Sequence, residues 1–208
     1  MTRTFVKICG ISSTEGLRAA IEAGADAVGF VFAESPRRVT PAAAAALSAQ
    51  VPPGIVSVAV MRHPAAADWL AVLAAFRPDY LQTDVEDYAA LAVPAAVRRL
   101  PVYRDTPALD SRALAREDRA LFEAASSGTG DRPDWHRARA LAATTELVLA
   151  GGLTPENVAA AVAAVRPWGV DVSSGVESTR GVKDPSRINA FVAAVRRAEQ
   201  ETVRGQDQ

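Results

Sequence analysis

The chain alternates between short runs rich in β-branched and aromatic residues and longer runs rich in alanine, and this alternation constrains its fold more than any other feature. Eight short runs are predicted as strands, at 5–9, 27–32, 56–61, 80–83, 101–104, 120–123, 147–150 and 170–173. Helices are predicted near 14–23, 40–49, 65–76, 86–99, 134–143, 155–165 and 184–199. Regular alternation favours parallel strands with right-handed crossovers. Eight strands fit a closed barrel better than an open sheet, so we expect a single-domain α/β protein, a (β/α)₈ TIM barrel.

The length of the chain agrees with one barrel. Its 208 residues are few for eight βα units but lie within the known range, and about half are hydrophobic, enough for a sizeable core. We expect the barrel to occupy residues 1–198 and a polar, disordered tail to occupy 199–208. The stretch 104–119 has the weakest pattern, so any helix there should be short.

Charge and cysteine content limit the classes of partner. With 23 basic and 24 acidic residues, the chain has no charge excess for nucleic acid or an anionic membrane. Its single cysteine excludes an intrachain disulfide and suits a reducing compartment. No apolar run reaches the roughly 18 residues of a membrane span, and residues 1–10 lack a signal-peptide pattern. We therefore expect a cytoplasmic protein that acts on a small molecule without an obligate protein partner.

The first and last strands carry charged residues at inward positions. Alternate side chains of a strand face opposite sides, so Lys7 and Cys9 should point into the barrel while Val6 and Ile8 face the helices. A buried lysine requires an acidic partner. Asp171, inward on the last strand, is the expected partner because the first and last strands are neighbours in a closed barrel.

Cys9 and Glu123 are candidates for proton transfer. Cys9 ends the first strand, where it is either a small buried hydrophobe or a base. As a base it would need a pKa below the usual value of about 8.5, lowered by Lys7 or a helix start. Glu123 ends the sixth strand, where it is either solvated or an acid, and the glycine-rich segment 127–130 after it is a candidate flap over a ligand.

Two glycine loops and one arginine are candidates for anion binding. The loops at 150–154 and 173–177 follow strands seven and eight, where barrels of this kind commonly hold a phosphate on backbone N–H groups. The predicted phosphate-binding residues are Gly151, Gly152, Ser173, Ser174 and Gly175. Arg37 follows a proline after strand two, so it is either a solvated charge or an anion ligand held at the rim. His63 and His136 are not spaced like metal ligands and no dinucleotide fingerprint is present, so we predict no metal and no cofactor.

Together these motifs resemble phosphoribosylanthranilate isomerase of tryptophan biosynthesis. The matching segments are 6–11, 24–32, 35–37, 149–158, 170–177 and 181–185. The resemblance spans about residues 5–196, strongest in the first forty and last sixty and poor in the middle. It implies an Amadori rearrangement of N-(5-phosphoribosyl)anthranilate without a cofactor. In the family, a general acid opens the ribose ring to a Schiff base, and a cysteine then removes the C2 proton.

The resemblance also assigns roles to individual residues. Cys9 matches the base, and the two glycine loops match the phosphate site. Arg37 and Asp171 match contacts to the anthranilate portion, and Lys7 and Gln82 complete the expected substrate-binding set.

Three positions depart from the family pattern. The general acid is usually an aspartate where this chain has Glu123, and the following Gly-Gly-Thr-Gly-Lys reads Ser-Gly-Thr-Gly-Asp at 127–131. The usual histidine after strand four is Asp84. This aspartate adds negative charge near an anionic substrate, which should weaken binding unless Arg37, Arg104 or Lys7 compensates.

Three other functions remain open. A metal-dependent pentose-phosphate epimerase would need histidines at strand ends. An isomerase that also accepts the histidine-pathway substrate would need a second phosphate site near the early loops. A non-catalytic barrel that binds a phosphorylated ligand would explain the changes at Asp84 and Glu123, but retention of Cys9 with an acid at 123 argues against it.

Overall fold

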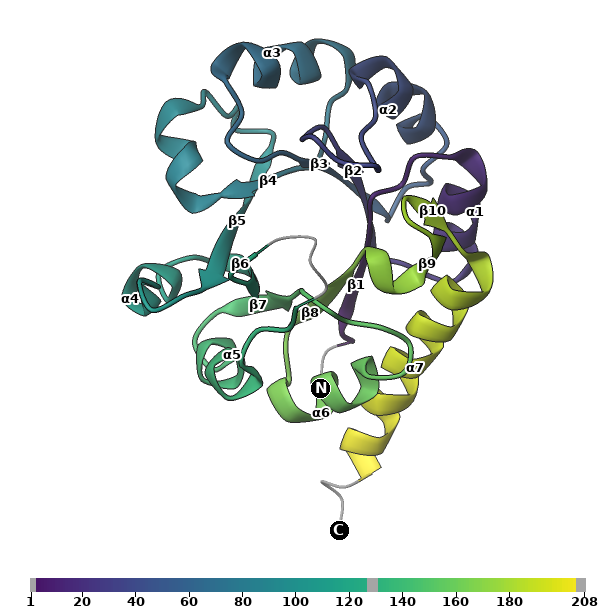
Figure 1. The fold of residues 1–208 in the computed structure, drawn as a ribbon, viewed down its shortest axis with the longest axis vertical. Coiled ribbons are helices and arrows are strands. Elements are labelled where there is room, and N and C mark those ends of the chain that lie inside the picture. The colour runs from purple at the N-terminus through teal and green to yellow at the C-terminus, as the bar shows by residue number, and fades with distance from the viewer. Residues whose placement is uncertain (1–2, 127–130, 205–208) are drawn as a thin grey trace.

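A computed structural model describes residues 3–126 and 131–204, and it confirms the barrel prediction. Eight parallel strands close into one barrel in the order of the chain, with β1 hydrogen-bonded to both β2 and β8. The strands are β1 (Phe5–Cys9), β2 (Ala27–Val31), β3 (Val56–Val60), β4 (Tyr80–Asp84), β5 (Arg98–Asp105), β6 (Arg119–Ala124), β7 (Glu146–Leu149) and β8 (Gly169–Val172). Figure 1 shows them as the inner ring of the molecule.

The helices lie outside this ring (Figure 1). They are α1 (Thr14–Glu22), α2 (Pro41–Ser48), α3 (Ala66–Ala75), α4 (Ser111–Leu114), α5 (Trp135–Ala142), α6 (Val158–Val165) and α7 (Pro185–Arg204). Two 3₁₀ segments, η1 (Val85–Ala90) and η2 (Ser174–Val176), follow β4 and β8, and a two-stranded ribbon of β9 (Glu177–Thr179) and β10 (Val182–Lys183) precedes α7.

The alternation of side chains along each strand builds two apolar layers. Outward residues such as Val6, Ile8 and Phe122 are fully buried against the helices. Inward residues pack with one another inside the barrel and include Ala27, Val58, Tyr80, Leu100, Val102, Leu121, Val148 and Ala150. Both layers exclude water, and their burial drives closure of the ring.

Proline and a polar cap set the start of two helices. α2 begins at Pro41, and Oγ1 of Thr40 accepts a hydrogen bond from the N–H of Ala43 at 3.1 Å. α7 begins at Pro185 in the same way, with Asp184 Oδ1 accepting from the N–H of Ser186 at 2.8 Å. Proline suits this position because the first helical N–H has no partner within the helix.

The helix predicted near 86–99 is wrong. After β4 the chain makes only the six-residue η1, and β5 begins at Arg98. Pro94 disfavours helical geometry at the residue before it. The hydroxyl of Tyr88 donates to the carbonyl of Leu81 and accepts from the N–H of Leu100, which ties the short segment to β4 and β5. At 104–119 the prediction of a short helix is confirmed by the four-residue α4.

The prediction that a disordered tail begins at residue 199 is wrong for 199–204, which continue α7. Ala198 is buried, and the carboxylate of Glu199 accepts hydrogen bonds from the N–H of Thr4 at 2.6 Å and from Arg196 at 2.8 Å. These bonds attach the helix to the start of β1. Residues 205–208, the rest of that prediction, lie outside the described residues.

The amino-terminal end of the barrel carries a stack of aromatic rings. Phe5 stacks on Trp168 with ring centroids 4.6 Å apart, and the guanidinium of Arg119 lies 3.5 Å from the Trp168 centroid. Such stacking is stabilising and leaves the opposite end for ligands. Within residues 3–126 and 131–204, none of the helices combines the length and apolar character that crossing a membrane requires.

Candidate active site

The predicted site residues meet at the carboxyl ends of the strands. A cavity of about 260 Å³ there is lined by Cys9, Arg37, Gln82, Glu123, Asp171 and Ser173, among others. A smaller cavity of about 80 Å³ adjoins it between the loops after β6, β7 and β8, and Glu123, Asp171 and Ser173 line both. The two cavities therefore form one continuous site with a wide part and a narrow part.

Lys7 and Asp171 form the predicted ion pair beneath the wide cavity. The Lys7 Nζ lies 2.8 Å from Asp171 Oδ1, and the two residues are paired in the register of β1 and β8. Lys7 is fully buried; burial opposes its charge, but Asp171 and Cys9 together outweigh burial and raise the pKa of Lys7. Gly29 on β2 leaves room for this ammonium and for the Cys9 Sγ, because an added Cβ would lie 3.1 and 3.2 Å from them.

Cys9 faces the cavity, as predicted, but its pKa does not move as predicted. Burial raises the pKa of the Cys9 thiol, and the nearby ammonium groups of Lys7 and Lys183 only partly oppose this effect. A thiol that acts as a base was expected to have a lowered pKa. The pKa of Cys9 is raised instead, because the side chain is buried and the removal of water disfavours the thiolate.

Arg37 is held by an acid that the sequence analysis did not single out. Its Nε and Nη2 donate to the two carboxylate oxygens of Glu177 at 2.6 and 2.9 Å. Lys183 Nζ donates to the same carboxylate at 2.8 Å, and the N–H of Gly181 donates at 2.9 Å. Burial opposes ionisation of Glu177, but these donors lower its pKa to about 2. We call Arg37, Glu177 and Lys183 the Glu177 cluster.

A second cluster lies across the cavity on β4, β5 and β6. Arg104 Nε donates to Asp84 Oδ1 at 2.8 Å, its Nη2 lies 2.6 Å from the same oxygen, and its Nη1 donates to Glu123 Oε1 at 2.9 Å. We call these three residues the Arg104 cluster. Arg104 thus compensates the charge of Asp84, as the sequence analysis required of Arg37, Arg104 or Lys7.

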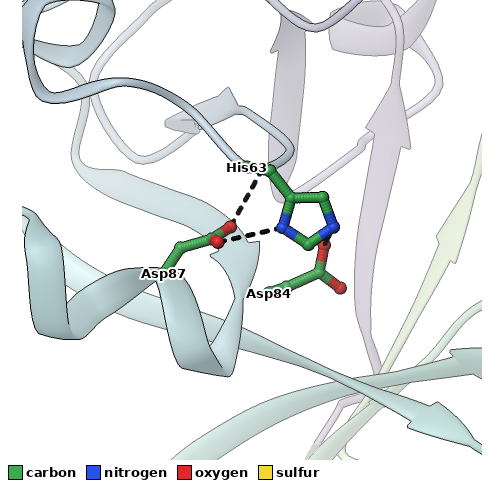
Figure 2. A group of neighbouring side chains, drawn as sticks. All are labelled: His63, Asp84 and Asp87. Atoms are coloured by element: carbon green, nitrogen blue, oxygen red, sulfur yellow. Dashed lines mark hydrogen bonds and ion pairs between the residues drawn. The ribbon is translucent and has the colours of Figure 1, made fainter.

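His63 extends this cluster toward the surface. Its backbone N–H and its ring Nδ1 each lie 3.0 Å from an oxygen of Asp87, and its Nε2 lies 3.6 Å from Asp84 Oδ2 (Figure 2). The hydrogen bond with Asp87 raises the pKa of His63, because the nearby carboxylates favour the charged form of the ring.

His63 belongs to a group of possible metal ligands although its spacing along the chain did not indicate one. It lies in the loop after β3, and His63, Asp84 and Asp87 offer ligand atoms within 4.8 Å of one another. The residues are distant in sequence, so spacing along the chain did not indicate the group.

Glycine loops shape the narrow cavity. Gly151 and Gly152 have φ angles of 91° and 58°, which glycine adopts without strain. They line the cavity with Ser173 and Ser174, whereas Gly175 packs behind it, where an added Cβ would lie 1.9 Å from the carbonyl oxygen of Leu153. Four of the five predicted phosphate-binding residues therefore face the space. The candidate flap at 127–130 lies outside the described residues.

One buried acceptor in the wide cavity is available to a ligand. Gln82 Oε1 is buried and has no hydrogen-bond partner among the described residues, and Gln82 lines the cavity. Asp84 Oδ2 also accepts no hydrogen bond among these residues, but it lies 3.6 Å from His63 Nε2. Because an unsatisfied buried acceptor is costly, Gln82 Oε1 would favour a ligand that carries a donor.

Glu177, Lys183 and His63 were not predicted from the sequence as parts of the site, and Arg104 was named only as a possible counter-charge to Asp84. Arg104 follows the alternation of β5 and could have been placed inward by it. Glu177 and Lys183 lie in segments that the resemblance already quoted, 170–177 and 181–185, but the pairing of the two depends on how the β9–β10 ribbon folds.

Fold and cavity together define a (β/α)₈-barrel enzyme whose ligand site lies at the carboxyl ends of its strands. Comparison with known proteins narrows this class. The family model for N-(5'phosphoribosyl)anthranilate (PRA) isomerase matches residues 6–194. The chain belongs to that family, and it is an isomerase.

Relatives and solved structures agree over nearly the whole chain. The N-(5'-phosphoribosyl)anthranilate isomerase of Bordetella petrii is 41% identical, covering 95% of this chain and 97% of the relative. That of Paracoccus denitrificans is 43% identical, covering 90% and 95%. The crystal structure of the Thermotoga maritima enzyme superposes with a TM-score of 0.80 at 31% identity, covering 93% and 98%. Another isomerase structure, in complex with reduced 1-(o-carboxyphenylamino)-1-deoxyribulose 5-phosphate, has a TM-score of 0.76 at 31% identity, covering 93% and 98%.

Proposed function

We propose that this chain converts N-(5-phosphoribosyl)anthranilate to 1-(2-carboxyphenylamino)-1-deoxyribulose 5-phosphate, an Amadori rearrangement in tryptophan biosynthesis, by general acid–base catalysis. The observation that carries the proposal is the family match over residues 6–194. The gathering of Cys9, Arg37, Glu123 and Asp171 around one cavity supports it.

Glu123 is the proposed general acid. It gives a proton to the ring oxygen of the ribose while the C1–O bond breaks and the nitrogen lone pair forms the C=N bond of the Schiff base. Its side chain lines both the wide and the narrow cavity, which suits a group that must reach the sugar between an aromatic ring and a phosphate.

Cys9 is the proposed general base. It removes the C2 proton of the Schiff base, and the resulting enolamine tautomerises to the ketone. Burial alone disfavours the thiolate. The positive charge of a protonated Schiff base would favour it, because an opposite charge nearby stabilises the ionised form. The thiol is therefore proposed to ionise with the substrate in place.

We propose that the two cavities bind different parts of the substrate. The phosphate would lie in the narrow cavity on the backbone amides of the loops at 151–152 and 173–175, where glycine permits close approach. Arg37, Gln82 and Asp171 would contact the anthranilate and ribose portions from the wide cavity, with Lys7 holding Asp171 in place.

The proposed setting is the cytoplasm, in which the single Cys9 stays reduced. The small phosphorylated substrate is the only partner we propose, and no metal, cofactor or obligate protein partner enters the mechanism.

Turnover of freshly made N-(5-phosphoribosyl)anthranilate tests the proposal. The purified protein should abolish the fluorescence of this substrate, and the product should be the ketone. Binding of the substrate without loss of fluorescence would instead favour the non-catalytic barrel. Activity that requires a divalent cation and acts on pentose phosphates would favour the epimerase, and turnover of the bis-phosphorylated histidine-pathway substrate would broaden the specificity.

A further inference from the structure

Arg104 is shared unequally between two carboxylates. Its Nε donates to Asp84 Oδ1 at 2.8 Å and its Nη2 lies 2.6 Å from the same oxygen, whereas the contact to Glu123 is the hydrogen bond from Nη1 to Oε1 at 2.9 Å. The side chain of Asp84 is 3% exposed, whereas that of Glu123 is 17% exposed. Because an ion pair is stronger where water is excluded, the guanidinium is held mainly by Asp84.

Neighbouring residues hold Asp84 in this position. It is the last residue of β4, and its second oxygen, Oδ2, lies 3.6 Å from His63 Nε2 (Figure 2). His63 is in turn held through its backbone and its ring by Asp87. The two oxygens of Asp84 therefore face two different basic side chains, His63 at Oδ2 and Arg104 at Oδ1.

This arrangement affects the proton of Glu123. A guanidinium that faced Glu123 alone would stabilise its carboxylate and oppose its protonation. Asp84 supplies a second negative charge beside the same guanidinium and so offsets that effect. An acid in a catalytic cavity needs such an offset, since it must hold a proton at neutral pH in order to deliver one.

We propose that Asp84 is a positioning residue, which engages Arg104 and thereby leaves Glu123 able to hold the proton that opens the ribose ring. The inference rests on the proposed function, in which Glu123 is the general acid. It gives Asp84, the residue found where the family usually has histidine, a part in the reaction without direct contact to the reacting atoms.

The other ionisable residues around Glu123 are the same in the wild type and in all the variants compared. The ionisable groups that line the two cavities besides the Arg104 cluster are Cys9, Glu34, Arg37, Arg62, Asp131, Asp171 and Arg180. None of these groups is substituted in the variants that test Asp84, so a change in the pH profile of kcat reports on Asp84, Arg104 and His63.

The main test is the pH profile of kcat for Asp84→Asn. The basic limb of this profile reports loss of the proton from the acid in the enzyme–substrate complex. We expect the limb to move to lower pH by about one unit, so that kcat on the basic side falls about tenfold and recovers as the pH is lowered. KM should change little. An unmoved limb, or a loss confined to KM, would overturn the proposal.

Removing Arg104 as well provides a rescue. In Asp84→Asn/Arg104→Gln the guanidinium that stabilises the Glu123 carboxylate is gone, so the basic limb should return to the wild-type position or beyond it. A limb that stays at low pH in the double variant would show that Asp84 acts by another route and would contradict the proposal.

His63→Asn decides the matter if Asp84→Asn does not fold. Asparagine tolerates the left-handed backbone of this position, where φ is 45°, and the His63 side chain is 55% exposed, so the variant should fold. Removal of the imidazole ring leaves Asp84 Oδ2 without its basic neighbour, so the Asp84 charge acts more fully on Arg104 and Glu123, and the basic limb should move slightly to higher pH. A shift to lower pH, or none, would contradict the proposal.

The experiment separates this proposal from the proposed function. Absence of turnover by the wild-type protein would contradict the function itself. Full activity of Glu123→Gln would contradict the choice of acid. If the wild-type protein turns over the substrate and Glu123→Gln is impaired, but the basic limb of Asp84→Asn does not move, only the positioning role of Asp84 is contradicted.

Discussion

Two clusters of charge face each other across the cavity with opposite composition. In the Glu177 cluster one carboxylate is shared by two cations, Arg37 and Lys183. In the Arg104 cluster one cation is shared by two carboxylates, Asp84 and Glu123. The first has an excess of positive charge and the second an excess of negative charge.

This difference separates a structural role from a chemical one. A carboxylate among donors stays ionised over the whole accessible pH range, and it fixes the orientation of the arginine beside it. In the Arg104 cluster two carboxylates share one cation, and the proposed mechanism assigns the reacting proton to one of them, Glu123. The substrate is itself divided in the same way, with a phosphate that needs donors and a ring oxygen that needs a proton.

Cys9 lines the same cavity as Arg37 and Arg104, and its substitution should have the largest effect on catalysis. Cys9→Ser should fold normally but lose kcat by roughly 10³-fold, because a hydroxyl is a far weaker base than a thiolate. Steady-state kinetics and thermal unfolding of the same preparation measure the two quantities. A kcat near that of the wild type would exclude Cys9 as the base.

Glu123→Gln tests whether the Arg104 cluster supplies the proton of the reaction. Glutamine keeps the shape but cannot deliver a proton, so kcat should fall by roughly 10²-fold or more. Glu123→Asp is the matched control and should keep part of the activity, since only its reach changes. If Glu123→Gln were fully active and Asp84→Asn inactive, the acid would be Asp84.

Glu177→Gln tests whether the Glu177 cluster stabilises the folded protein. A carboxylate whose pKa falls from 4.5 to about 2 on folding stabilises the folded chain above pH 4.5, and this contribution is lost as the pH falls toward 2. The variant should lose roughly 3 kcal/mol of unfolding free energy at pH 7, and the difference from the wild type should shrink by pH 3. Denaturant unfolding at the two pH values measures it.

An exposed ion pair gives the control for that experiment. Glu146 pairs with Arg119, but its side chain is 48% exposed, so Glu146→Gln should change the unfolding free energy by less than about 1 kcal/mol at either pH. Equal losses for both variants would show that the Glu177 cluster is no more structural than a surface pair.

The smallest effect is expected in the narrow cavity. Gly152→Val should raise KM about tenfold with a smaller change in kcat, because a side chain there keeps the phosphate from one or two backbone donors. Gly54→Val is the matched control: its φ is 99° and an added Cβ meets nothing within 4 Å, so it introduces backbone strain without touching the site. A ligand-bound structure with the phosphate elsewhere would contradict this prediction.

The sequence predicted the parts of the molecule that follow a local rule. Period-two alternation placed Lys7 and Cys9 inside the barrel, and closure of eight strands implied the pair of Lys7 with Asp171. Glycines at two strand ends indicated the loops of the narrow cavity. In each case the residue type and its position along the strand were sufficient.

What the sequence did not predict depends on distant contacts. In place of the helix expected near 86–99, which Pro94 disfavours, the chain makes a short segment that Tyr88 hydrogen-bonds to β4 and β5. The bond between Arg37 and Glu177 spans 140 residues. The unexpected rise in the pKa of Cys9 depends on how completely water is removed, which the packing of the whole ring determines.

The pair of Lys7 and Asp171 also has a consequence for synthesis of the protein. The two residues are 164 positions apart in the chain, although their side chains touch. At a translation rate of roughly 5–20 residues per second, Lys7 leaves the ribosome roughly 10–30 s before its partner exists. During that interval the first strand carries an ammonium that no barrel can bury. The site therefore forms in the same event that closes the ring, and no nascent fragment that lacks the eighth strand should be active.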